Sequence, residues 1–130
     1  MGFCLMTTHY HLLVEVGDGV LPRAMHRVKL AYSRDFNRRH GLRGHAQSGR
    51  YRSRRVSGEA QLLTAFAYVA NNPVKSGAVA TAAEWTWSSY PGTVGLAEPH
   101  SFVDASRVTA CFEGSREVAV ARLRAFVEES

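Results

Sequence analysis

Two histidines have the spacing of a metal-binding pair. His9 and His11 are two positions apart at the start of a predicted strand. In this strand Tyr10, Leu12, Val14 and Val16 alternate with His9, His11, Leu13 and Glu15. Successive side chains of a strand point to opposite faces, so both imidazoles would share one face and could converge on a single ion. Taken alone, such a pair is more often an ordinary part of a strand, in the core or at the surface.

A phenol and an amide are spaced to act from one side of a helix. Tyr68 precedes the helix-ending sequence Asn71-Asn72-Pro73, and its direction is about 120° from the apolar stripe of that helix. Asn72 follows four residues later, about 40° further round. The phenol could attack a phosphorus atom while the amide oxygen helps to hold a cation. The alternative is a structural tyrosine at the edge of an amphipathic helix.

Positive charge is concentrated in one third of the chain. The net charge is +5 and the pI about 9.7, but eleven cations stand between residues 23 and 55, opposed by Asp35 alone. Carboxylates outnumber cations elsewhere. This asymmetry favours a surface that meets a polyanion, over the alternative of a solvated basic face. The predicted DNA contacts are Arg38, Arg39, Arg43, Arg50, Tyr51, Arg52, Arg54 and Arg55.

The last five of these contacts interleave an aromatic ring with guanidinium groups. This arrangement suits base stacking combined with phosphate contact on single-stranded or hairpin DNA. The alternative is an exposed edge strand that is protected by its charge.

Periodicity and capping signals predict the elements that must position these residues. The first half of the chain is predicted to hold a half-buried strand at Tyr10–Val16, a helix at about Leu21–His40 followed by Gly41, and a short strand at about Tyr51–Val56. A helix capped by Ser57 is expected from Gly58 to about Asn71, followed by a turn at Pro73–Val79. The last elements are a short helix at Thr81–Trp85 and a helix at Arg116–Glu129. On the first helix, Leu21, Met25, Val28, Tyr32 and Phe36 form one stripe, which we expect to face the core. Trp85, Trp87 and Tyr90 are also expected to fill the core. Strands mixed with helices favour an α+β fold with a mainly antiparallel sheet.

Length and composition exclude several classes of protein. A chain of 130 residues fits one compact domain, and no apolar run approaches the roughly 20 residues needed to span a bilayer. The first residues do not resemble an export signal. Cys4 and Cys111 match no metal-binding spacing, so we expect neither a disulfide framework nor a structural zinc site. These features predict a cytoplasmic protein.

Five ordered blocks resemble the REP-associated tyrosine transposases, a branch of the IS200-like transposases with an HUH motif and a single catalytic tyrosine. The first block, from Cys4 to Glu15, looks like the HUH segment, with Tyr10 between the two histidines. The other blocks are Phe36-Asn-Arg-Arg-His-Gly41, Gly49-Arg-Tyr-Arg-Ser53, Tyr68-Val-Ala-Asn-Asn-Pro-Val-Lys-Ser-Gly-Ala-Val79 and Trp87-Ser-Ser-Tyr90. The resemblance covers about residues 2 to 90.

The resemblance implies a ferredoxin-like two-layer sandwich that cuts and rejoins single-stranded or hairpin DNA. It assigns His9, His11 and Asn72 as ligands of Mg²⁺ or Mn²⁺, and Tyr68 as the nucleophile that forms a 5′-phosphotyrosine. It also implies a core at residues 1–98, lacking the strand and helix that usually precede it, with a helical extension at 99–130 packed on the same domain. A monomer or a homodimer is expected.

Two other interpretations remain open at this point. One is a catalytically inactive DNA-binding remnant that keeps the basic surface, and the other is a small metal-binding protein unrelated to nucleic acid. The assignment of the nucleophile requires the folded chain to bring Tyr68 within about 10 Å of the histidines, because attack demands close approach of the reacting groups.

Overall fold

An antiparallel hairpin opens the chain. In a computed structural model, which describes residues 1–47 and 49–130, β1 (Gly2–Leu5) pairs with β2 (Tyr10–Leu13), with Cys4 opposite His11. On its other edge β1 bonds to residues 87–89: the amide of Leu5 donates to the carbonyl of Trp87 at 2.8 Å, and the amide of Ser89 donates to the carbonyl of Phe3 at 3.0 Å. The hairpin is therefore extended by a short third segment from far along the chain.

The strand β2 is shorter than the alternating pattern predicts. It ends at Leu13 rather than Val16, because Gly2, the first residue of β1, already pairs with Leu13. The apolar residues on the opposite face from Leu13 are largely exposed, including Leu12 and Val14. Leu13 itself is buried, since its face is the one that packs against α2.

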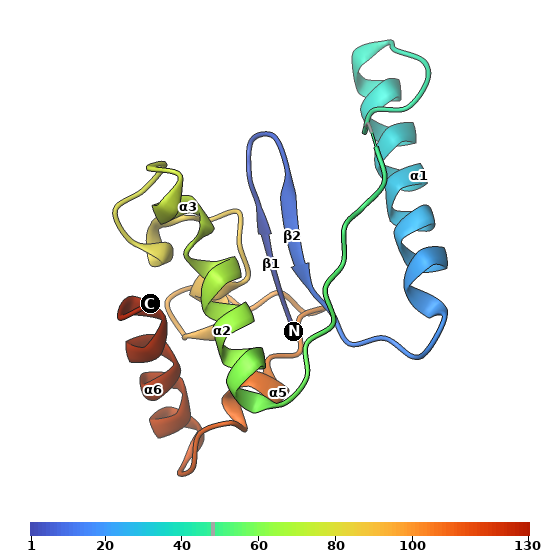
Figure 1. Ribbon diagram of the computed structural model, residues 1–130. Coiled ribbons are helices and arrows are strands. Elements are labelled where there is room, and N and C mark those ends of the chain that lie inside the picture. The colour runs from blue at the N-terminus through green and yellow to red at the C-terminus, as the bar shows by residue number, and fades with distance from the viewer. Residues whose placement is uncertain (48) are drawn as a thin grey trace. The chain divides into compact units, whose positions relative to one another are not determined.

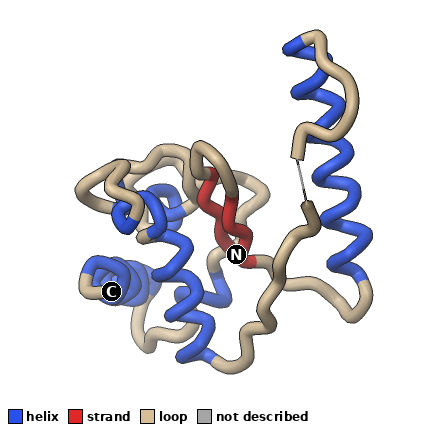
Figure 2. The backbone as a smooth tube through the Cα atoms, turned by 45° about the horizontal axis from the view of Figure 1, so that its top comes forward, coloured by secondary structure: helices blue, strands red, loops and turns tan. Residues whose placement is uncertain are grey.

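The helix α2 (Glu59–Ala70) packs on the hairpin, and the short helix α3 (Asn72–Lys75) follows it (Figures 1 and 2). Phe66 and Val69 are buried as its apolar stripe predicts, and the helix ends before Pro73 as expected. The predicted cap at Ser57 is wrong. The helix is preceded by Gly58, whose φ of 79° favours glycine, while the Ser57 amide donates to the side chain of Gln61 at 2.6 Å.

The C-terminal part of the chain completes the same core. The elements here are η1 (Ala82–Glu84), α4 (Tyr90–Thr93), α5 (Ser106–Thr109) and α6 (Arg116–Glu128). Val108, Leu123 and Val127 are fully buried together with Phe66 and Tyr90. The Asn71 side chain at the end of α2 donates to the Val127 carbonyl at 2.7 Å, a buried bond that joins the ends of two helices.

Trp87 corrects one expectation about the core. Tyr90 is buried as expected, whereas Trp87 is 65% exposed and Trp85 is partly buried, its indole donating to the Leu5 carbonyl at 2.9 Å. Trp87 lies in the segment that pairs with β1. Pairing through its backbone leaves the ring free to point away from the core.

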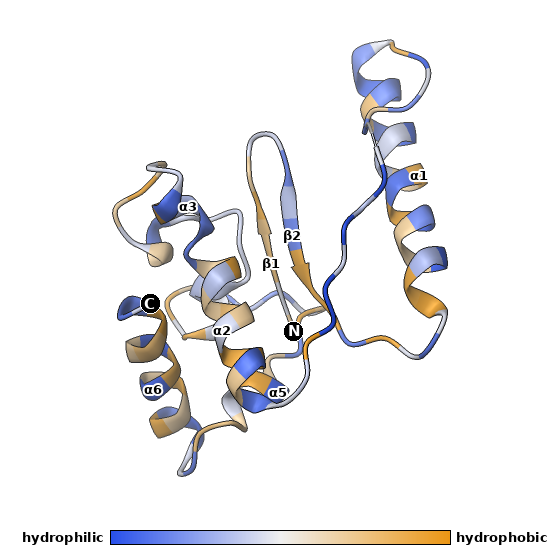
Figure 3. Ribbon diagram, viewed as in Figure 1, coloured by the Kyte–Doolittle hydropathy of each residue, from blue (hydrophilic) through white to orange (hydrophobic). Residues whose placement is uncertain are grey.

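Residues 15–55 form a second compact unit, and residues 1–14 and 56–130 form the first. The second unit holds α1 (Val20–His40), which ends at Gly41 as predicted. The side chains of Asn37 and Ser33 bond to the backbone of Gly44 and Ala46, which ties the segment after the helix back onto it. That segment is strongly hydrophilic as it leads toward α2 (Figure 3).

Two predictions within this unit are wrong. None of the described residues from 51 to 56 belongs to a strand. On α1 only Met25 of the expected core stripe is buried, while Val28 and Tyr32 are exposed. Inside its own unit the helix has little besides an extended polar segment to pack against, so the stripe is not covered there.

The mixture of an antiparallel hairpin and several helices confirms the α+β class. Within the described part of the chain, no helix is both long and apolar enough to cross a membrane. The division into residues 1–98 and 99–130 refers to family boundaries and stays a prediction, although α5 and α6 contact α2 in the first unit.

Replacing Leu123 tests whether α6 belongs to this core. We expect Leu123→Ala to lower the free energy of unfolding by about 2–5 kcal/mol, because it removes a fully buried side chain and leaves a cavity. The matched control Leu96→Ala alters a half-exposed side chain and should cost less than about 1 kcal/mol. Urea unfolding measures both values, and equal costs would show that α6 does not share the core.

Candidate active site

The hairpin and α2 bring together the residues that the sequence singles out. The rings of His9 and His11 have centroids 5.0 Å apart, and those of His11 and Tyr68 are 5.4 Å apart, each pair nearly perpendicular. All three residues lie in the first unit. The separation of the Tyr68 and His11 rings is therefore well inside the limit of about 10 Å that attack on a shared phosphate requires.

Each of these side chains is placed by the packing of its element. His11 lies in β2 on the face that carries Cys4 and Leu13, which packs against α2. His9 lies at the end of the hairpin turn, where its carbonyl accepts a hydrogen bond from the Met6 amide at 2.8 Å. Tyr68 is 50% exposed, on the side of α2 away from the Phe66 stripe. A phenol in this position is accessible to a large substrate.

The surroundings of His11 favour the neutral form of its imidazole. Burial lowers the pKa of His11 below its ordinary value of 6.5, and the charge of His9 lowers it further. The Asn72 side chain opposes both effects as a hydrogen-bond partner of the imidazole. Nε2 itself is enclosed, and it makes no hydrogen bond of standard geometry with any described residue. A neutral imidazole with an unsatisfied nitrogen is the form that binds a metal ion.

Asn72 reaches the site from the junction of α2 and α3. Its Nδ2 donates to the Tyr68 carbonyl at 3.4 Å. This bond uses one N–H of the amide, and the amide oxygen is the atom of this side chain that could bind a cation. Asn72 thus lies beside both His11 and Tyr68, as its four-residue spacing from the tyrosine predicts.

The donor set is compatible with a divalent ion but small. Among residues 1–47 and 49–130, no three His, Cys, Asp or Glu side chains gather in a way that could hold a metal. A site would therefore need Asn72 as its third ligand, with positions left open for phosphate oxygens. Two imidazoles and an amide suit Mn²⁺ as well as Mg²⁺, and Zn²⁺ also accepts imidazoles. The unsatisfied Nε2 of His11 is the observation that fits such an ion.

Lys75 is a neighbour of the site to which the sequence analysis gave no role. Its Nζ lies 5.5 Å from the centroid of the Tyr68 ring. Helical spacing from Tyr68 gave no signal of this contact, because α2 ends at Ala70 and Lys75 belongs to the separate helix α3, where the sequence predicts a turn. Among residues 1–47 and 49–130, Lys75 is the one cation that lies over the ring of this tyrosine.

The predicted DNA contacts all belong to the second unit, whereas the histidines and Tyr68 belong to the first. Arg38 and Arg39 both pair with Asp35, at 2.7 and 2.8 Å, on the exposed last turns of α1. The other contacts, Arg43, Arg50, Tyr51, Arg52, Arg54 and Arg55, follow the helix in irregular structure, and the arginines among them are exposed. One carboxylate shared by two guanidinium groups leaves this unit strongly positive.

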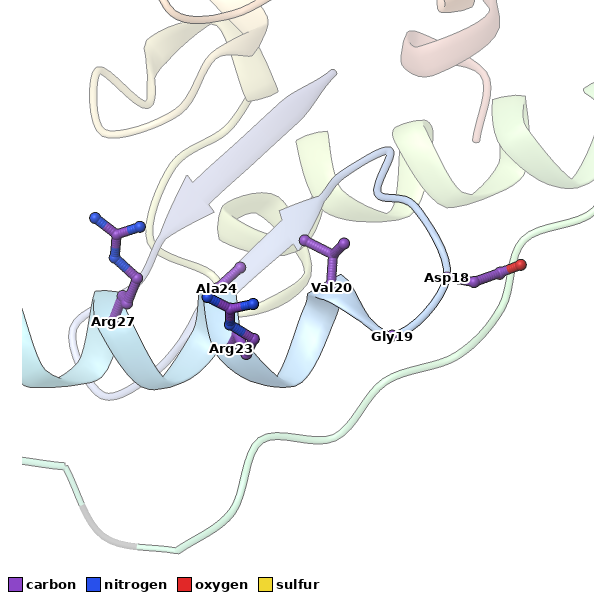
Figure 4. A pocket seen from close by; sticks show the side chains of 6 residues that line it. All are labelled: Asp18, Gly19, Val20, Arg23, Ala24 and Arg27. Atoms are coloured by element: carbon purple, nitrogen blue, oxygen red, sulfur yellow. The ribbon is translucent and has the colours of Figure 1, made fainter.

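The start of α1 adds two cations beyond the predicted contacts. A hollow there is lined by Asp18, Gly19, Val20, Arg23, Ala24 and Arg27, and its two arginines come from successive turns of the helix (Figure 4). Both belong to the basic stretch identified in the sequence. The positive surface of this unit therefore extends along α1 to its first turn.

Comparison with known proteins places the chain in no family: no protein-family model, curated protein or solved structure gives a significant match.

The shifted pKa of His11 predicts a dependence of stability on pH in metal-free buffer. Because the folded-state pKa lies below 6.5, the unfolded chain takes up the proton first as pH falls. The free energy of unfolding that depends on a neutral His11 is therefore fully present above pH 6.5 and is lost as pH falls from 6.5 through the folded-state pKa. The unfolding free energy of the unsubstituted chain should therefore fall more steeply below pH 6.5 than that of His11→Gln. Identical pH slopes in urea titrations would contradict the burial of the imidazole.

Proposed function

We propose that this protein is a metal-dependent HUH-type transposase or endonuclease that cuts and rejoins single-stranded or hairpin DNA through Tyr68. The contact between the exposed Tyr68 ring and the His11 imidazole carries the proposal. It joins a nucleophile to a ligand residue 57 positions earlier in the chain. A core tyrosine or a simple strand histidine would not require this meeting.

The proposed cleavage uses the Tyr68 phenol, the DNA strand and solvent. The Tyr68 phenol loses its proton to solvent, and its oxygen attacks the phosphorus. The P–O3′ bond breaks and O3′ takes a proton from solvent, so one strand leaves with a free 3′-OH and the other is held as a 5′-phosphotyrosine. Attack by a 3′-OH on the same phosphorus reverses the step and releases the phenol. No nucleoside triphosphate is needed, because the covalent link keeps the phosphoester bond.

His9, His11 and Asn72 would hold Mg²⁺ or Mn²⁺ in this scheme. When bound, the ion would polarise the scissile phosphate and offset the negative charge that develops on it. The residues themselves contribute position: His11 presents a neutral, enclosed nitrogen, and Asn72 presents its amide oxygen from the helix junction. His9 is fixed near its neighbour by the hairpin turn.

The arginine-rich unit would supply affinity for the DNA backbone. Arg38 and Arg39 lie in the last turn of α1, the arginines that follow the helix are exposed in irregular structure, and the partly buried Tyr51 offers a ring for stacking among guanidinium groups. We also assign the first unit to a ferredoxin-like sandwich. The hairpin, its pairing with residues 87–89 and the packing of α2 against both of its strands are compatible with that arrangement.

A DNA-binding remnant without activity is the second candidate. Among the described residues, no three His, Cys, Asp or Glu side chains gather in one place. A site made of two histidines and one amide would bind a metal ion weakly, and this favours the remnant. Both candidates bind DNA, and only the transposase forms a covalent adduct.

Substituting Tyr68 separates the two candidates. With Mn²⁺ and a hairpin oligonucleotide carrying randomised single-stranded flanks, the unsubstituted chain should give an SDS-resistant, protease-sensitive adduct. Tyr68→Phe should reduce the adduct to background, because it removes only the attacking oxygen. The control Tyr32→Phe, which alters another exposed tyrosine, should leave the yield unchanged. DNA binding without any adduct would support the remnant instead.

The salt dependence of DNA binding tests the arginine contacts. Each of Arg50→Gln, Arg52→Gln and Arg54→Gln should weaken binding to a single strand and lower the slope of log K against log salt by about 0.7 to 1, because a phosphate contact is lost. Arg122→Gln in α6, whose guanidinium donates to the Glu113 carbonyl, is the control and should change neither. Fluorescence anisotropy measures both quantities. Binding insensitive to salt would indicate a metal-binding protein unrelated to nucleic acid.

A further inference from the structure

The ammonium group of Lys75 stands over the ring of the proposed nucleophile. Its Nζ lies 5.5 Å from the Tyr68 centroid, and no carboxylate among the described residues forms an ion pair with it. An exposed cation–π contact contributes only about 0.5–1 kcal/mol. The contact with the ring therefore adds little to the stability of the fold, and it does not by itself account for an unpaired charge beside Tyr68.

The backbone under Lys75 is fixed. The Lys75 amide donates to the Asn71 carbonyl at 2.9 Å, and the Ser76 hydroxyl donates to the Pro73 carbonyl at the same distance. Pro73 is buried beneath the turn. The chain thus holds the base of this exposed side chain, and its four-carbon stem reaches the ring of Tyr68.

The choice of lysine is unusual for this chain. Of its 16 cationic residues only Lys29 and Lys75 are lysines, which leaves 14 arginines. A guanidinium is planar and stacks flat on an aromatic ring, whereas an ammonium is a compact charge with three donors that can reorient. At a tyrosine that must stay accessible, a lysine can reach a ligand without covering the ring.

We propose that Lys75 binds a non-bridging oxygen of the scissile phosphate at Tyr68. This inference rests on the proposed function. A phosphodiester that meets the phenol oxygen brings negative charge close to the ring, and that charge is spread over the equatorial oxygens in the transition state. A positioned cation acts most strongly where such charge develops. Lys75 would therefore assist the attack more than it assists initial binding of the DNA.

Kinetics distinguish this role from general attraction of DNA. In single-turnover adduct formation with the hairpin oligonucleotide and Mn²⁺, Lys75→Gln should lower the rate at saturating DNA by 10- to 100-fold, with less than a threefold change in the half-saturating concentration. Lys75→Arg keeps the charge and should recover part of the rate, and Arg122→Gln should match the unsubstituted chain. An unchanged saturated rate, or a loss confined to half-saturation, would overturn the proposal.

A labelling experiment tests the contact even without cleavage. Reductive methylation followed by mass spectrometry reports on Lys75 separately from Lys29, the other lysine of the chain. In Tyr68→Phe, which cannot form the adduct, saturating oligonucleotide should reduce methylation of Lys75 several-fold. Equal methylation with and without DNA would overturn the contact. If protection is seen but the unsubstituted chain forms no adduct, the proposed activity fails while the phosphate contact at Lys75 stands.

Discussion

The close packing of α2 on one face of the hairpin is the constraint on which the candidate site depends. Gly2 allows a close approach: a Cβ there would lie 3.4 Å from the Phe66 ring of α2 and 3.2 Å from the Ser89 hydroxyl oxygen. Because side chains alternate along a strand, the face that meets α2 also carries His11. The same contact that buries Phe66 therefore delivers an imidazole to the edge of the helix where Tyr68 projects.

Local signals predicted the parts of the fold that local forces decide. The end of α1 at Gly41, the apolar stripe of α2 and the helix α6, expected at Arg116–Glu129 and found at Arg116–Glu128, follow from periodicity and helix-end signals. The meeting of His11 with Tyr68 could not be derived from spacing alone, because it depends on long-range packing. Ordered blocks of resemblance supplied that expectation.

The predictions that proved wrong concern elements that need a partner from elsewhere in the chain. The strand expected near residues 51–56 had suitable residues, but no described segment pairs with it, and an isolated strand has no ladder to stabilise it. Val28 and Tyr32 fit a helix stripe whose covering element is not found within their own unit. Likewise, the alternating pattern continues beyond Leu13, but Gly2, the first residue of β1, already pairs with Leu13, so the later residues have no strand partner there. Pattern indicates which face is apolar, but it does not supply a partner for that face.

The buried bond from Asn71 to the Val127 carbonyl links the candidate site to the far end of the polypeptide. Asn71 is the residue between α2 and α3, next to the amide proposed to bind a cation, while Val127 lies one residue before α6 ends. A truncation or bulky fusion that unwinds the last turn of α6 would leave this side-chain amide without its acceptor inside the apolar interior. The helix junction would then loosen, so a segment that contributes no reactive group would still govern the alignment of those that do.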